Sequence, residues 1–128
     1  MCGVVGFAGI DAADLLPAMV DSVSHRGPDA TGQWLAPDMR TGLGHSRLAI
    51  LDLDPRGRQP MTSEDGDIVL AFNGEIYNYR TLRHELSSCG YRFRTETDTE
   101  VVLNLWLRDR HVGLHRLDGM FALAIWNR

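Results

Sequence analysis

The order in which strand-like and helix-like segments follow one another most constrains the fold of this chain. Residues 3–9 read GVVGFAG, in which apolar and β-branched residues with regularly spaced glycines predict a buried strand. Apolar residues then recur at helical spacing from Leu15 to Val23, and Gly27 with Pro28 predicts the end of that helix. Two further strands are predicted in TGQWLA and LGHSRLAIL, on either side of a turn-rich segment.

The rest of the chain continues this mixture. Residues 52–67 lack periodicity and predict a long loop before a strand in IVLAFNG. Helices are predicted around 79–88, with Asn78 as the N-cap, and around 98–110, where Thr97 and Glu100 have the spacing of a capping box. The apolar run MFALAIWNR predicts a central strand, with no partner strand after it. This order of elements predicts a layered α/β or α+β fold.

The size and charge of the chain exclude several classes of function. Its 128 residues, 44% of them hydrophobic, suffice for one small domain with its own core. A net charge of -4 leaves no excess of basic residues for a nucleic acid. No apolar run is long enough to cross a membrane and no secretion signal is found, so a cytoplasmic location is expected. Cys2 and Cys89 are therefore expected to be free thiols, and the scattered histidines predict no metal site.

Cys2 is the most informative single residue. Its small side chain favours removal of Met1, which would leave a thiol and a free α-amine on one residue. The amine titrates at about 7.7 to 8.0 and the thiol at about 8.5, so the amine can act as the base that a nucleophilic thiol requires. The alternative is a small buried residue near the start of a strand. Gly3, which allows close approach to the thiol, and three polar groups downstream favour the catalytic interpretation.

Arg47 and the pair Asn73 and Gly74 are the first two of these groups. Arg47 interrupts an apolar run, and an inward guanidinium would bind a carboxylate through two hydrogen bonds. The alternative, commoner for a lone arginine, is a side chain directed to solvent. Asn73 and Gly74 follow a strand and could donate two hydrogen bonds to a developing oxyanion. The alternative there is a hairpin turn, although residues 75–77 begin no obvious return strand.

Asp98 and Glu75 are the third group. Asp98 falls in the first turn of a predicted helix, where the helix dipole stabilises an acid whether or not it binds a ligand. If both carboxylates face the same pocket, they would hold an ammonium group. A carboxylate site, an ammonium site, an oxyanion pocket and a thiol together fit an α-amino acid with a side-chain amide.

Six segments carry a family resemblance, in the expected order and over essentially the whole chain. They are MCGVVGFAG, SHRGPDATG, LGHSRLAILDL with RQPM, FNGEIYNY, TDTEVV and LDGMFALAIW. The chain resembles the glutaminase domain of class II glutamine amidotransferases, most closely the asparagine synthetase type. The resemblance implies an α+β fold, the four-layer αββα sandwich of the N-terminal nucleophile hydrolases. It further implies that residues 1–128 are an incomplete glutaminase domain, truncated at its C-terminus and without a synthetase domain.

The resemblance also assigns roles to individual residues. Cys2 would be the nucleophile, Arg47 would hold the α-carboxylate of glutamine, and Asn73 with Gly74 would form the oxyanion hole. Glu75 and Asp98 would hold the α-ammonium group. The pocket would be lined by Leu48, Ala49, Ile50 and Leu51.

The implied reaction converts glutamine to glutamate and ammonia through a glutamyl thioester, and it needs no cofactor. A synthetase domain or subunit would then use the ammonia, with ATP and Mg²⁺, to amidate aspartate or a related carboxylate. Family members are commonly dimeric, so a homodimer is also implied.

Two other classes of function stay open. One is an N-terminal nucleophile hydrolase that acts on another amide, although Arg47 together with Asp98 argues for recognition of both ends of an amino acid. The other is a non-catalytic binding or scaffold module. Residues 25–29 are interpreted as a structural turn rather than as the floor of an ammonia path, and Cys89 as a structural residue.

Overall fold

Two antiparallel sheets face each other in the computed structural model, which describes residues 2–49 and 55–128. The first sheet has the strand order β1-β3-β2 and the second the order β4-β5-β6. The strands are β1 (Gly3–Ala8), β2 (Ala30–Leu35), β3 (Thr41–Arg47), β4 (Met61–Thr62), β5 (Ile68–Ile76) and β6 (Gly119–Asn127).

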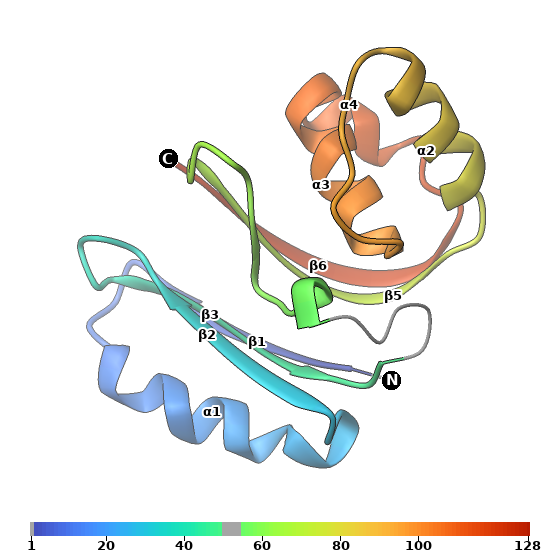
Figure 1. Cartoon of the computed structure of the whole chain (residues 1–128). Helices are drawn as coiled ribbons and strands as arrows, with labels where there is room; N and C mark the ends of the chain where they lie inside the picture. The colour runs from blue at the N-terminus through green and yellow to red at the C-terminus, as the bar shows by residue number, and fades with distance from the viewer. Residues whose placement is uncertain (1, 50–54) are drawn as a thin grey trace.

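Helices cover the outer face of each sheet (Figure 1). The first sheet is covered by α1 (Leu16–Ser22), which lies between the 3-10 turns η1 (Ala13–Leu15) and η2 (Ser24–Arg26). The second sheet is covered by α2 (Tyr79–Ser88), α3 (Asp98–Asp109) and α4 (His111–Leu114), and a third 3-10 turn, η3 (Pro55–Gly57), precedes β4. The predicted four-layer αββα arrangement is confirmed.

The alternation of side chains along each strand decides what enters the space between the sheets. In β5, Leu70 and Phe72 pack in a core with residues of α2 and α3, whereas Val69 and Ala71 pack with Leu43 of β3. This pattern continues to the ends of β3 and β5, where polar residues replace apolar ones. The same alternation that builds the two cores therefore directs polar side chains into one end of the space between the sheets.

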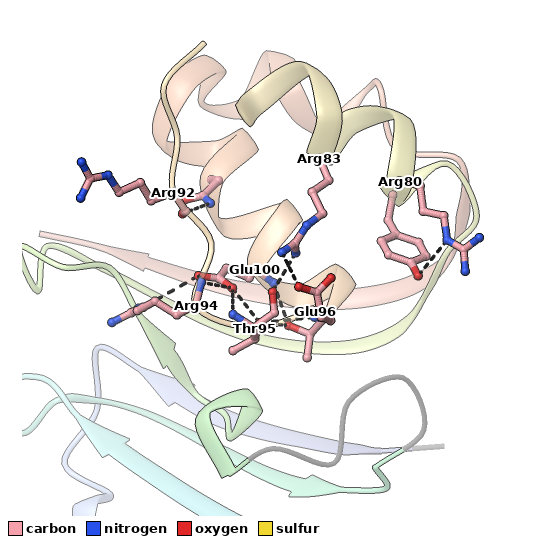
Figure 2. A network of polar contacts seen from close by, with 10 residues as sticks. Arg80, Arg83, Arg92, Arg94, Thr95, Glu96 and Glu100 are labelled. Atoms are coloured by element: carbon pink, nitrogen blue, oxygen red, sulfur yellow. Dashed lines mark hydrogen bonds and ion pairs between the residues drawn. The ribbon is translucent and has the colours of Figure 1, made fainter. Parts of the chain in front are cut away.

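A buried carboxylate fixes the segment that leads into α3 (Figure 2). Glu100 accepts hydrogen bonds from Arg94 N at 2.8 Å, from Thr95 N at 2.7 Å and from the Thr95 hydroxyl at 2.7 Å. Arg83 of α2 donates to the Thr95 carbonyl at 2.7 Å. Thr97 caps α3 by accepting from Glu100 N at 3.3 Å. The predicted capping box is thus only half formed, because the Glu100 carboxylate binds the preceding loop instead of Thr97 N.

Two of the predicted element ends differ from the structure. The strand predicted over residues 43–51 ends at Arg47, because the chain then leaves the sheet to hydrogen bond elsewhere. The predicted loop over residues 52–67 contains η3 and the short strand β4, and residues 50–54 lie outside the described part. The helices at 79–88 and 98–109 confirm the two helices predicted in this half of the chain to within one residue.

One further detail corrects an expectation for the second half. Asn78 does not cap α2 through its side chain, which instead donates to Arg116 O at 2.9 Å and accepts from Asp118 N at 3.1 Å. Within the described residues β6 pairs with β5 alone, and Met120 and Phe121 are 69% and 40% exposed, so the prediction of a central strand stays a prediction. Within the described chain, no helix has the length and apolarity to span a membrane.

Candidate active site

A pocket of about 90 Å³ lies at the end of the intersheet space where polar residues gather. Most of the residues predicted from the sequence line it: Cys2, Arg47, Leu48, Asn73, Gly74, Glu75 and Asp98. It is completed by Gly57, Gln59, Phe72, Thr97, Thr99 and Met120. These residues come from six separate segments of the chain, so the pocket exists only in the folded chain.

Cys2 is held on two sides at the entry to β1. Leu48 N donates to Cys2 Sγ at 3.3 Å, and the thiol lies 3.7 Å from Leu48 O. On the main-chain side, Arg26 Nε donates to Cys2 O at 3.0 Å. The interpretation of residues 25–29 as a structural turn missed this contact of Arg26. The expected removal of Met1 lies outside the described residues.

Arg47 points into the pocket and is 7% exposed, so the solvent-facing alternative is wrong. Its direction follows from strand alternation, because it lies two residues after His45 and four after Leu43, which both face the other sheet. Asp29 holds the main chain at Arg47 and just after it: Asp29 N donates to Arg47 O at 3.0 Å, and Ala49 N donates to the Asp29 carboxylate at 2.8 Å.

Two of the predicted pocket-lining residues, Ile50 and Leu51, lie outside the described part of the chain, and Ala49 is not among the residues that line the pocket.

Gly57 packs directly on the guanidinium of Arg47. A Cβ atom at Gly57 would come within 2.6 Å of Arg47 Nη2 and within 3.1 Å of Arg47 Cζ. The 3-10 turn η3 therefore sets where the guanidinium can lie.

Asn73 and Gly74 lie inside β5 and pair with Ala122 and Phe121 of β6, so the hairpin-turn alternative is wrong. The alternation that turns Ala71 toward the first sheet also turns Asn73 that way, into the pocket. Gly74 is required by close packing, since a Cβ atom there would come within 2.6 Å of Phe121 Cα.

The backbone of β5 presents alternate residues to the edge opposite β6. Leu70 pairs with β4 at this edge, and the Ile76 amide donates to the Asp98 carboxylate at 3.0 Å. Phe72 hydrogen bonds to side chains at the same edge, through its N–H and its carbonyl. By the same alternation Gly74 N–H faces this edge, between Phe72 and Ile76 and toward the pocket that Gly74 lines.

Asp98 and Glu75 place two carboxylates in the same pocket. Asp98 is buried at the N-terminus of α3, where the N–H of Ile76 and the helix dipole stabilise its charge. Burial nevertheless raises the pKa of Asp98, and the nearby charge of Glu75 raises it further. Two carboxylates in one pocket favour a cation there.

The fold is that of the N-terminal nucleophile hydrolases. The solved structure of glutamine phosphoribosylpyrophosphate amidotransferase from B. subtilis matches with a TM-score of 0.86 at 23% identity, over 99% of this chain and 35% of that one. The model of the glutamine amidotransferase domain family matches residues 1–128, and the chain belongs to this family.

The curated relatives narrow the similarity within the family to the asparagine synthetase type. Asparagine synthetase [glutamine-hydrolyzing] 1 of Bacillus subtilis is 41% identical over 100% of this chain and 21% of its own length. An amidase of Gibberella zeae is 39% identical over 88% of this chain and 16% of its own length. The chain therefore spans about a fifth of the length of the asparagine synthetase that it matches.

Proposed function

We propose that Cys2, once Met1 is removed, hydrolyses the side-chain amide of L-glutamine. The observation that carries this proposal is the meeting of Cys2, Arg47, Asn73 and Asp98 in one pocket. A guanidinium for an α-carboxylate, carboxylates for an α-ammonium group and a thiol match the chemical groups of glutamine.

The residues act in sequence on the amide. The Cys2 thiol gives its proton to its own α-amine, and the sulfur forms a bond to the amide carbon. The amide oxygen gains negative charge and accepts hydrogen bonds from the Asn73 side chain and Gly74 N–H. The carbon–nitrogen bond then breaks, the amine returns the proton to the leaving nitrogen, and ammonia departs. Water cleaves the remaining thioester, which yields glutamate and restores the thiol.

The ammonia would serve an ATP- and Mg²⁺-dependent amidation in a synthetase domain or subunit. The curated relatives named as glutamine-hydrolysing asparagine synthetases support aspartate, or a related carboxylate, as the acceptor. The glutaminase step itself needs no cofactor, because the nucleophile, the base and the oxyanion donors are all supplied by this chain. A second candidate is hydrolysis of a different amide, which the similarity to an amidase favours.

Mass spectrometry combined with an ammonia assay tests this proposal. The mature protein is expected to begin at Cys2 and to release ammonia from L-glutamine. L-asparagine, one methylene shorter, is the comparison substrate, since Arg47 and Asp98 would hold its amide carbon away from the thiol. Retention of Met1, or a protein that begins at Cys2 but releases no ammonia from glutamine, would overturn the proposal. Faster hydrolysis of a different amide would favour the second candidate.

A further inference from the structure

Two buried side chains complete the edge of β5 just before the Asn73–Gly74 pair. Gln59 Oε1 accepts a hydrogen bond from Phe72 N at 2.6 Å, and His45 Nε2 lies 3.0 Å from Phe72 O. Gln59 is 7% exposed and His45 is fully buried. The two side chains come from different parts of the fold, His45 from β3 and Gln59 from the segment between η3 and β4. Both backbone polar groups of Phe72 are thus bound by side chains.

These contacts lie along β5 just beyond Met61, the first residue of β4. β4 pairs with β5 only through Met61 with Leu70 and Thr62 with Val69, so it does not reach Phe72. A longer β4 would have covered the edge and paired with Gly74 as well. Side chains that bind Phe72 alone leave the next amide on this edge, Gly74 N–H, for a ligand in the pocket.

The protonation state of His45 makes it a hydrogen-bond donor to Phe72. Because Phe72 O can only accept, Nε2 must carry the proton. Burial lowers the pKa of His45 to about 4, and the charge of Arg47 adds to this effect, so the ring is neutral at physiological pH. Nδ1 is then a bare acceptor, and it has no hydrogen-bond partner in the described part of the chain.

Gln59 joins Phe72 to the opposite wall of the pocket. Its amide nitrogen donates to Thr99 Oγ1 at 3.3 Å, in the first turn of α3 beside Asp98. One side chain therefore sets the spacing between the strand that carries Gly74 and the helix that carries Asp98. In the proposed reaction these two groups act on opposite ends of glutamine, so their spacing decides how the substrate fits.

We propose that His45 and Gln59 are positioning residues for the oxyanion pocket. They hold the backbone of Phe72 so that the Asn73 side chain and the Gly74 N–H point at the amide oxygen of glutamine. The inference rests on the proposed function. Neither residue takes part in the bond changes. Because the oxyanion exists only during reaction, loss of these hydrogen bonds should lower kcat more than it weakens glutamine binding.

Paired variants in the full protein test the inference. His45→Leu removes the donor to Phe72 O, whereas His45→Gln places an amide N–H near the position of Nε2. Gln59→Leu removes the acceptor for Phe72 N, whereas Gln59→Glu keeps an acceptor there. We expect both leucine variants to lower kcat for glutamine hydrolysis roughly tenfold or more, with KM changed less than about threefold. His45→Gln and Gln59→Glu should recover most of that loss, and His84→Leu, on an exposed face of α2, is the control for the substitution itself.

The competing explanation is a general effect on folding. In that case KM, kcat and the unfolding temperature would change together, and His45→Gln would be as impaired as His45→Leu. This result, or a wild-type kcat in both leucine variants, would overturn the inference. The amide NMR signals of Phe72 and Gly74 provide a readout without turnover, and both should shift in each leucine variant. If the wild-type protein releases no ammonia, the proposed function fails, while unshifted amide signals would show that the positioning link itself is wrong.

Discussion

The backbone N–H of Leu48 lies 3.3 Å from the sulfur of Cys2, so the residue that follows Arg47 in sequence contacts the thiol directly. An N–H donor can serve the thiol and the thiolate alike. The contact also fixes how the segment that carries the Arg47 guanidinium lies against the segment that carries the Cys2 sulfur. A glutamine whose carboxylate is bound by Arg47 is thereby placed at a set distance from the nucleophile.

Replacement of Cys2 by alanine should abolish ammonia release from glutamine. Cys89→Ala is the matched control, because Cys89 is exposed at the end of α2 and does not line the pocket. It should retain nearly all activity and stability. Ammonia release measured for both purified variants decides the assignment, and an equal loss in both would contradict it.

Arg47→Lys should raise the KM for glutamine by roughly tenfold, because a point charge replaces a planar fork that binds a carboxylate through two hydrogen bonds. The unfolding temperature should stay close to that of the wild type. Arg40→Lys on the exposed turn before β3 is the control for the same substitution, and its KM should equal that of the wild type. Initial rates over a range of glutamine concentrations would reveal the difference, and an unchanged KM for Arg47→Lys would exclude the carboxylate role.

The sequence predicted the residues of the pocket better than the contacts that hold them. Strand patterns are local, so the sequence could place Arg47 and Asn73 on strands, and the family motifs predicted roles for them that stay predictions. The hydrogen bonds from Arg26 to Cys2 and from Phe72 to Gln59 join positions 24 and 13 residues apart. No local pattern specifies such pairs, because they depend on how the sheets and turns pack. The end of β3 at Arg47 escaped prediction for the same reason, since the apolar run continues past it.

Glu100→Gln should lower the free energy of unfolding by about 2 kcal/mol, because the buried carboxylate accepts three hydrogen bonds from Arg94 and Thr95 and an amide can satisfy only part of them. Glu96→Gln is the control on the same loop. Its side chain is 77% exposed, so its ion pair with Arg83 should contribute less than about 1 kcal/mol. Urea unfolding of both variants measures the difference, and equal midpoints would refute the role given to Glu100.

Protonation of His45 should contribute to unfolding in acid. Burial lowers its pKa from 6.5 to about 4, so between these values the unfolded chain binds a proton that the folded chain does not. Stability therefore falls as the pH drops from 6.5 to 4, by up to about 3 kcal/mol from this residue. Asp98 has the opposite effect on stability, because its raised pKa lets the folded state bind a proton at a higher pH than the unfolded state does. Comparison of the wild type with His45→Gln isolates the contribution of the histidine. The difference in unfolding free energy between these two proteins should change between pH 6.5 and 4, and a constant difference would contradict this contribution.

Gly57→Ala tests how strictly η3 sets the position of the guanidinium. An added Cβ atom would lie 2.6 Å from Arg47 Nη2 and 3.1 Å from Thr97 Cγ2, closer than ordinary packing permits. The end of a long side chain can shift more cheaply than backbone, so the arginine is expected to move and the fold to survive. The KM for glutamine should then rise severalfold, toward the value of Arg47→Lys, while kcat and the unfolding temperature change little. The double variant Gly57→Ala with Arg47→Lys should be no worse than Arg47→Lys alone, because both changes act on the same contact. Additive effects on KM would instead mean that Gly57 acts on the pocket by another route.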